Sequence, residues 1–150
     1  MKFKWLLVVF TCVAVQAFAA EQQVKTVEAP KATQKSSASL VGSWEFVSGR
    51  YTTTGKPPIE VKSPELRALK VITGTHFSYV TEKGDGTFYV AGAGSCKLEQ
   101  DKYTETLDYS SVATMKKKSY TFKYRIENDL WYMEGKEDDS YTEEVWRRVP

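Results

Sequence analysis

Cysteine and histidine are scarce in this chain of 150 residues, which contains two cysteines and one histidine. Cys12 lies in an apolar N-terminal segment, so Cys96 is the only thiol in the rest of the chain, where no intrachain disulfide can form. A lone histidine, His76, cannot build a multi-histidine zinc site, and no aspartate-rich cluster accompanies it. We therefore expect no metal and no other cofactor, and a fold whose stability comes from its apolar core.

An excess of charge of one sign and a long apolar run are also lacking. The 21 basic and 19 acidic residues give a formal net charge of +2, which is too small for a dedicated polyanion-binding protein. Nucleic acid is therefore not expected as a partner. The longest nearly unbroken apolar run, residues 5–15, falls short of the roughly 20 residues that a membrane-spanning helix needs.

The N-terminal segment has the features of a secretory signal peptide. Lys2 and Lys4 precede the apolar run, and Ala17 and Ala19 place small residues where signal peptidase reads the chain. We predict that residues 1–19 are a signal peptide, that export follows the Sec route, and that the mature protein is periplasmic or secreted without a transmembrane segment. Cleavage removes two basic residues and no acidic one, which leaves the mature chain formally neutral.

Residues 20–39 contain no aromatic residue, and valine is their only branched aliphatic residue. Such a segment cannot bury enough apolar surface to offset the entropy lost on ordering. We predict a flexible linker here, with an arm that docks on a partner as the alternative. Residues 40–150 then form one domain, which is long enough for a single core.

Turn residues divide this domain into short segments that are typical of β-strands. All nine glycines fall between Gly42 and Gly135, and β-branched or aromatic segments recur between the turns. In the clearest segment Tyr120, Phe122 and Tyr124 alternate with polar residues. The predicted strands span residues 40–51, 68–73, 75–82, 87–90, 95–99, 103–109, 119–126, 130–134 and 141–149.

About eight antiparallel strands in one small domain favour a closed barrel, because closure removes the exposed edges of an open sheet. The segment 91–94 reads Ala-Gly-Ala-Gly, which allows a bulge or a sharp bend between two strands. Only residues 63–69 resemble a helix, with Ser63 as the N-cap and Pro64 in the first turn. The prediction is an all-β, antiparallel, up-and-down barrel with at most one short helix.

Tryptophan and arginine near the two ends of the domain carry a resemblance to a known family. Gly42-Ser43-Trp44 opens the first strand and Trp146-Arg147-Arg148 lies in the last, and this order resembles the signature of lipocalin-like (calycin) barrels. The resemblance implies that Trp44 closes one end of the barrel and that Arg147 or Arg148 packs across its ring, as a guanidinium stacks on an indole.

Residues 70–77, 103–105 and 144–148 are similar to small secreted bacterial lipocalin-like domains, whose function is generally uncharacterised. The chain lacks the second Thr-Asp-Tyr motif, the disulfides and the C-terminal helix of larger lipocalins. A lipocalin ligand is therefore not implied by the resemblance.

Glu105 is an unusual residue for its position, because strand alternation places it on the same face as Tyr103, Leu107 and Tyr109. A carboxylate on an apolar face is rarely left unpaired. One interpretation is a polar anchor that orients a ligand in a cavity. The other is a structural role, in which Glu105 accepts hydrogen bonds from tyrosine hydroxyls or pairs with Arg125 or Arg147.

Tyrosine occurs nine times and mostly in predicted strands. Each hydroxyl needs a partner, which a partly wet cavity supplies more easily than a dry core. His76 could lie beside Glu105 as an orienting or acid–base pair, or it could make an ordinary hydrogen bond. The candidate ligand-binding residues are His76, Tyr79, Tyr103, Glu105, Tyr109 and Tyr124.

The charged runs 116–118 and 137–139 read Lys-Lys-Lys and Glu-Asp-Asp, and we interpret both as exposed turns. The acidic run lacks the spacing of a calcium-binding EF-hand. No GxSxG, phosphate-binding or HExxH motif occurs.

The preferred functional hypothesis is an exported protein, not an enzyme, that holds a hydrophobic or amphipathic small molecule in a tyrosine-lined cavity. A filled barrel that docks on an envelope protein is the alternative. The third and least favoured hypothesis is an enzyme that uses Glu105 and His76. It ranks last because no nucleophile is evident in the sequence.

Overall fold

The structure, a computed structural model, describes residues 39–150. The predicted signal peptide and residues 20–38 of the predicted linker lie outside the described residues. Strands and tight turns make up nearly all of the described part, together with one 3₁₀ turn, Ala113–Met115. The strands are β1 (Gly42–Thr53), β2 (Ile59–Lys62), β3 (Leu66–Ile72), β4 (His76–Lys83), β5 (Phe88–Leu98), β6 (Lys102–Ser110), β7 (Ser119–Glu127), β8 (Leu130–Glu137) and β9 (Ser140–Arg148).

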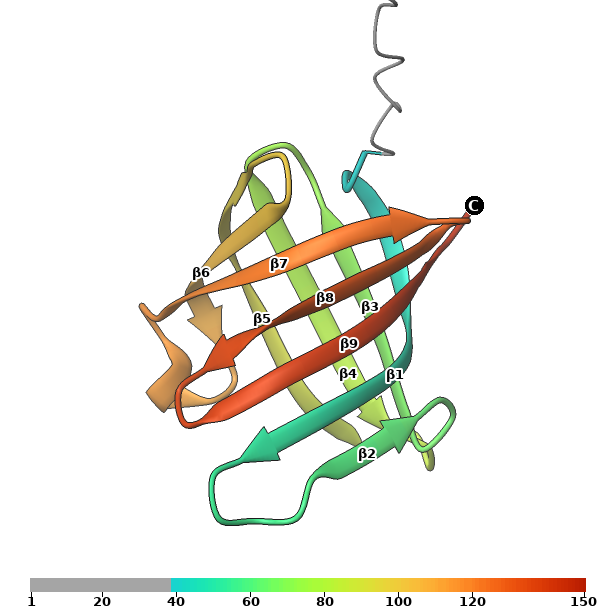
Figure 1. Ribbon diagram of the computed structural model, residues 1–150, viewed down its shortest axis with the longest axis vertical. Helices are drawn as coiled ribbons and strands as arrows, with labels where there is room; N and C mark the ends of the chain where they lie inside the picture. The colour runs from blue at the N-terminus through green and yellow to red at the C-terminus, as the bar shows by residue number, and fades with distance from the viewer. Residues whose placement is uncertain (1–38) are drawn as a thin grey trace, which may run out of the picture. The chain divides into compact units, whose positions relative to one another are not determined.

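The strands form a closed antiparallel barrel (Figure 1). From β3 to β9 each strand pairs with its neighbour in sequence, and β1 pairs with both β3 and β9, from Trp44 opposite Arg148 to Thr53 opposite Ser140. This closes eight strands into a ring and confirms the predicted all-β barrel. The short β2 is an addition that pairs with β1 next to the place where β3 leaves it.

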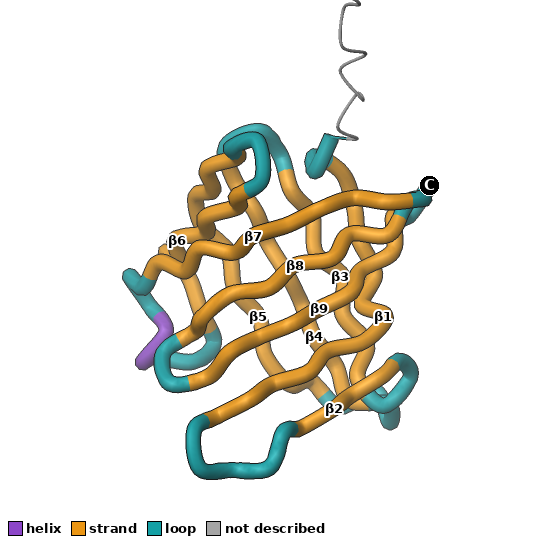
Figure 2. The backbone as a smooth tube through the Cα atoms, in the orientation of Figure 1, coloured by secondary structure: helices purple, strands orange, loops and turns teal. Residues whose placement is uncertain are grey.

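The predicted helix at residues 63–69 is wrong. Residues 63–65 form a turn, and β3 begins at Leu66. From there Ala68, Lys70 and Ile72 point into the barrel while the residues between them are exposed. The two-residue alternation of apolar positions therefore overrides the local helix-start pattern of Ser63 and Pro64. Figure 2 shows the one helical segment of the described residues between β6 and β7 instead.

The predicted break between residues 90 and 95 is also wrong, because β5 runs unbroken through the glycines. The glycines instead permit a bulge, which was the other predicted option: the register of β5 and β6 shifts between Ala93 and Gly94. A Cβ at Gly94 would overlap the backbone carbonyl of Thr106, so only glycine fits this approach.

This bulge changes which residues of β6 face the inside of the barrel after Leu107. Gly94 lies opposite Leu107, and Ala93 lies opposite Tyr109, so Asp108 is an extra residue on β6. Leu107 is fully buried, whereas Tyr109 is 74% exposed on the outer wall. A second shift, between Phe46 and Ser48, occurs where β1 faces β9. Beyond it Gly49 is buried and Arg50 is exposed.

The predicted break between the strand that ends at residue 126 and the strand that begins at residue 130 is confirmed as a tight turn. Asn128 and Asp129 both have a positive φ, at 51° and 61°, as the two central residues of a type I′ hairpin require. Asn and Asp tolerate this conformation better than most residues. The turn brings β8 back along β7 with Glu127 opposite Leu130.

Candidate functional site

One end of the barrel is closed by Trp44, which is fully buried. Its indole Nε1 donates a hydrogen bond to the carbonyl of Leu40 at 2.9 Å, and the guanidinium of Arg148 lies 4.2 Å from the ring centroid. Arg148 also donates to the carbonyls of Val41 and Ser39. Arg148 therefore packs across Trp44, while Arg147 points outward and is exposed.

Aromatic rings fill the part of the barrel next to this closure. Trp131 contacts Trp44 edge-on at a centroid distance of 5.5 Å, stacks on Trp146 at 5.8 Å, and meets Tyr103 edge-on at 5.7 Å. Phe122 stacks on Tyr103 at a centroid distance of 6.3 Å. These rings are all less than 5% exposed, so they leave no open passage through this half of the barrel.

A buried ion pair lies on this aromatic layer. The Lys70 Nζ atom of β3 is 3.2 Å from Glu105 Oε2 of β6, and the two residues are 4% and 3% exposed. Five aromatic rings surround the ammonium group at 5.2–5.9 Å from Nζ. Burial opposes the charged form of Lys70, but the carboxylates of Glu105, Glu144 and Glu137 outweigh it and raise the Lys70 pKa. Lys70 is therefore a cation and not a nucleophilic amine.

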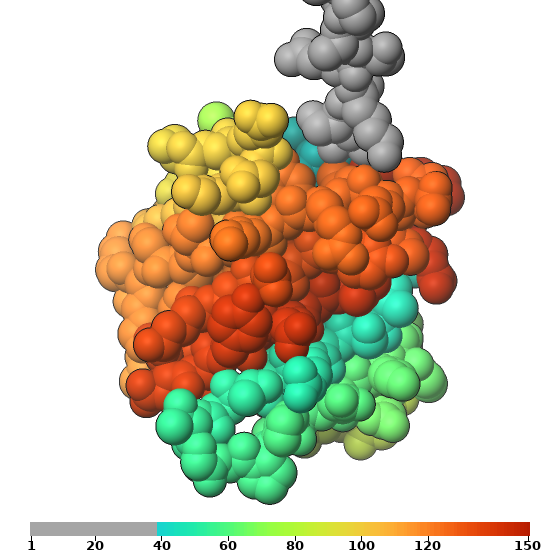
Figure 3. Space-filling model, in the orientation of Figure 1, coloured from blue at the N-terminus to red at the C-terminus, as the bar shows by residue number. Residues whose placement is uncertain are grey.

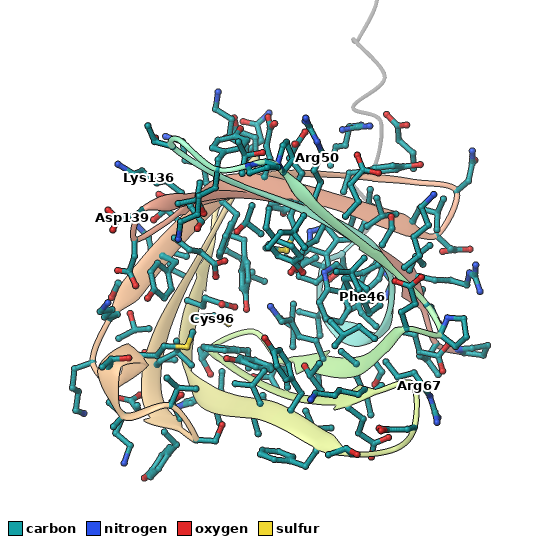
Figure 4. The ribbon with its side chains drawn as sticks, turned by 90° about the horizontal axis from the view of Figure 1, so that it is seen from below. Phe46, Arg50, Arg67, Cys96, Lys136 and Asp139 are labelled. Atoms are coloured by element: carbon teal, nitrogen blue, oxygen red, sulfur yellow. The ribbon has the colours of Figure 1, made fainter. Side chains whose placement is uncertain are left out.

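The opposite half of the barrel holds a cavity of about 620 Å³. Figure 4 looks along the barrel from below, and Phe46 points inward there, whereas Arg50 and Arg67 lie outside the wall. Side chains of several strands and of the β6–β7 connection line the cavity, with Lys70 and Glu105 buried among them, whereas Ile59 and Tyr89 are 62% and 57% exposed. Its apolar and aromatic lining comprises Phe46, Tyr51, Ile59, Val61, Leu66, Ala68, Tyr79, Tyr89, Val90, Val112, Met115, Met133 and Trp146.

Two further carboxylates face the cavity from β8 and β9. Glu144 accepts hydrogen bonds from the Tyr51 hydroxyl and from the Trp146 indole, both at 2.9 Å. Glu137 accepts one from the Thr142 hydroxyl at 2.7 Å. Burial and the neighbouring charge of Glu144 raise the Glu137 pKa to about 7. Burial, with the same carboxylate, also raises the pKa of Tyr51 far above its usual range, so this tyrosine remains a hydrogen-bond donor.

Two glycines make room for the tyrosine rings of the cavity wall. A Cβ at Gly49 would lie 2.6 Å from the Tyr51 hydroxyl oxygen, and one at Gly92 would lie 2.7 Å from the ring of Tyr79. Each ring therefore lies against glycine backbone, and a larger residue at either position would displace it.

Depressions of similar size occur on the outer wall. One of about 490 Å³ lies among Arg50, Glu143 and Lys62, whose strands belong to the face shown in Figure 3. Another of about 570 Å³ includes His76 and Tyr109. Mostly charged or polar side chains line the first of these, and Met133 and Glu144, which also line the inner cavity, are among them.

Comparison with protein families gives a match for residues 39–150, with the family described as a domain of unknown function (DUF4488). The chain belongs to this family. No protein of the curated collection matches it significantly. Among solved structures it is similar to an uncharacterized protein from Bacteroides eggerthii DSM 20697, at 19% sequence identity and a TM-score of 0.48, over 74% of this chain and 100% of that chain.

The structure of this DUF4488 member brings together only part of the predicted site. Tyr79 and Glu105 line the cavity. Tyr103 lies in the aromatic layer next to the cavity, where its hydroxyl is buried close to Glu105 and has no hydrogen-bond partner among residues 39–150. The partner of Glu105 is Lys70, and not one of the tyrosines or arginines that the sequence offered.

Three predicted ligand-binding residues lie away from the cavity. His76 is exposed on the outer wall, where its Nδ1 atom contacts the Thr75 hydroxyl at 2.9 Å, so it faces the opposite side of the wall from Glu105. Tyr109 is also outside, because of the bulge in β6. Tyr124 is half-buried near the β5–β6 turn, where its hydroxyl donates to the Glu99 carbonyl.

The sequence interpretation missed Lys70, Glu137 and Glu144. The predicted exposed turn at residues 137–139 is wrong for Glu137, which is the last residue of β8 and lines the cavity. The alternation within β9 contained the missing information for Glu144, since Thr142, Glu144 and Trp146 share one face. Lys70 shares a face with Ala68 and Ile72 in the same way.

Cys96 is half-buried and packs against the core. Burial, followed by the charge of Glu105, raises the pKa of its thiol. It is therefore not an activated thiolate. Among residues 39–150 the single helical segment has three residues, and no helix could cross a membrane.

Proposed function

We propose that this protein is an exported carrier that holds a hydrophobic or amphipathic small molecule inside its barrel. The observation that carries the proposal is the cavity of about 620 Å³, which has a mostly apolar and aromatic lining with a few polar groups. Ligand sites in proteins have this size and composition. Burial of apolar ligand surface would drive binding, and the polar groups would set its orientation.

The proposal includes a lipocalin-like (calycin) architecture. Trp44 near the start of the first strand, with Arg148 of the last strand stacked at 4.2 Å from its ring, supports this assignment. The pairing of β1 with β9, which closes the barrel, also supports it. The third supporting feature is that buried rings fill one half of the barrel while the other half holds the cavity. In this architecture the hollow half is the ligand-binding half.

We assign a passive role rather than catalysis. The charged groups of the cavity are Lys70, Glu105, Glu137 and Glu144, and Lys70 is held as a cation by its carboxylate neighbours. The pair suggested for catalysis, Glu105 and His76, is divided between the inside and the outside of the wall. Reversible binding requires none of the nucleophiles that an enzyme of this type would need.

A neutral fluorescent probe, N-phenyl-1-naphthylamine, tests the carrier function on the full chain. We expect saturable binding of one probe per barrel. Ala68→Phe places a ring in the cavity and should weaken the affinity by about tenfold or more, since the cavity loses much of its free volume. Ala93→Phe adds the same ring at the outer wall and is the matched control, with unchanged affinity expected.

Native mass spectrometry of the protein purified without denaturation provides a second measurement. A small molecule released on unfolding would identify a natural ligand. A bare chain together with no probe binding would contradict the carrier proposal and favour the filled barrel that docks on another envelope protein. The same spectra test export, because the mature chain should begin at Ala20 if residues 1–19 are removed.

A further inference from the structure

The cavity has more negative than positive side chains. It contains one lysine and three glutamates: Lys70, Glu105, Glu137 and Glu144. The contact of 3.2 Å between Lys70 and Glu105 neutralises one of each. Two carboxylates, Glu137 and Glu144, remain as the surplus.

Neither surplus carboxylate is paired with a cation of residues 39–150. Glu144 accepts hydrogen bonds from neutral donors only, Tyr51 and Trp146. Glu137 accepts from Thr142, also a neutral donor. Hydrogen bonds satisfy some lone pairs of a carboxylate but do not remove its charge, and a buried charge without a counter-ion is costly.

The lysine is not available to a ligand anion. Its Nζ atom contacts Glu105 and is enclosed by rings of Phe77, Tyr79, Tyr103, Trp131 and Trp146. An anionic headgroup would therefore lie near two carboxylates that have no direct contact with a cation of residues 39–150, and it could not reach the lysine. A neutral headgroup would leave Glu137 and Glu144 without a counter-ion.

The surroundings of the surplus carboxylates suit an ammonium group. Glu137 ends β8 at the β8–β9 turn, and the tyrosine rings of Tyr51 and Tyr89 line the same cavity. Carboxylates combined with aromatic faces attract organic cations by ion pairing and by cation–π interaction. Val90 of β5 and Met133 of β8 offer apolar surface for the rest of the molecule.

We propose that the cavity selects amphipathic amines, whose protonated nitrogen pairs with Glu137 and Glu144 while the apolar body fills the space between the strands. This inference rests on the proposed carrier function and names its ligand class. The raised pKa of Glu137 agrees with this inference. Burial and the charge of Glu144 disfavour the ionised form of Glu137, and a bound ammonium group would stabilise that form.

Three probes with the same apolar chain and different headgroups test the inference: decylamine, decan-1-ol and decanoate. At about pH 8 the amine is a cation and decanoate is an anion. Their affinities can be read from displacement of N-phenyl-1-naphthylamine or from calorimetry. We expect decylamine to bind about tenfold more tightly than decanol, and decanoate to bind most weakly.

Variants locate the preference. Glu137→Gln and Glu144→Gln should each reduce the ratio of amine to alcohol affinity to less than about threefold, with little change for decanol. Glu143→Gln is the matched control, because Glu143 points outward and pairs with Arg50 at 3.3 Å. It should leave the ratio unchanged. If either cavity variant fails to fold, the comparison of the three probes on the wild-type protein still decides the matter.

The outcomes separate this inference from the carrier function. Equal affinities for decylamine and decanol would overturn the amine preference and leave the carrier function standing. Tighter binding of decanoate would do the same and assign the cavity to anions. Absence of binding by all three probes and by N-phenyl-1-naphthylamine would overturn both.

Discussion

At the scale of single residues, the sequence predicts one member of the buried ion pair, Glu105, but not the other, Lys70. Alternation along residues 103–109 predicts that Glu105 faces inward and needs a partner, and both statements are confirmed. The partner could not be found from the sequence, because Lys70 lies 35 residues away and contacts Glu105 only through barrel closure. Long lysine side chains are also usually assigned to the surface.

The choice between Arg147 and Arg148 was within reach of the sequence. Side chains two residues apart share a face of a strand. Trp146 is an apolar residue that should face the core, so Arg148 and not Arg147 lies on its face. The structure has this arrangement, with Arg148 over Trp44 and Arg147 exposed.

Removal of one member of the buried ion pair should be strongly destabilising. Glu105 is 3% exposed in the wild type, and in Lys70→Met it loses the one cation of residues 39–150 that pairs with it. We expect a loss of about 3–5 kcal/mol in the free energy of unfolding, measured by urea denaturation. The double variant Lys70→Met with Glu105→Leu removes both charges and should recover most of that loss. A double variant no more stable than Lys70→Met alone would show that the charge is not the cause.

At the scale of the elements, the bulges explain where the sequence interpretation succeeded and where it did not. Strict alternation predicts Tyr103, Glu105 and Leu107 on one face, which is confirmed, and then Tyr109, which is wrong. The extra residue, Asp108, changes the phase of β6. Glycines at 92 and 94 indicated a bulge nearby, but the sequence does not show which of the two paired strands holds the extra residue.

Gly94 should therefore be the glycine of β5 that tolerates substitution least. A Cβ there would overlap the Thr106 carbonyl and approach the Asp108 amide nitrogen at 2.8 Å, and backbone cannot move aside as a flexible side chain can. We expect Gly94→Ala to lower the free energy of unfolding by about 1–3 kcal/mol or more.

Gly74 provides the matched control for this substitution. It lies in the β3–β4 turn, and no atom lies within 4 Å of the position of its Cβ. Gly74→Ala should change the stability by no more than about 0.5 kcal/mol. Equal effects of the two substitutions in urea denaturation would contradict the role assigned to the β5–β6 bulge.

At the scale of the whole molecule, the barrel divides into a filled half and a hollow half. The strand rhythm and the turn residues predict the closed all-β fold, since both are local features of the chain. The cavity could not be predicted in this way. Its depth depends on how Trp44, Trp131 and Tyr103 stack across the barrel from distant strands, and its charge depends on the strand ends that bring Glu137 inward.

Glu137 in the cavity should lower the free energy of unfolding as pH rises, because its carboxyl group is more easily protonated in the folded protein than in the unfolded chain. Burial and then the charge of Glu144 raise its pKa from 4.5 to about 7, against the opposing hydrogen bond from Thr142. Between these two values the folded state binds more protons than the unfolded state, so stability falls as pH increases through this window. The loss should reach on the order of 3 kcal/mol above the folded pKa and should vanish below the unfolded pKa.

Urea denaturation of the wild type and of Glu137→Gln at a series of pH values measures this contribution. The amide cannot ionise, so the variant should lack the decline, and the difference in unfolding free energy between the two proteins should grow in favour of the variant as pH rises. Taking the difference cancels the groups that both proteins share, such as Asp85 and Asp138, whose pKa values are lowered by their hydrogen bonds. If the difference in unfolding free energy between the two proteins stays constant across the pH range, the cavity does not raise the pKa of Glu137 and this prediction is wrong.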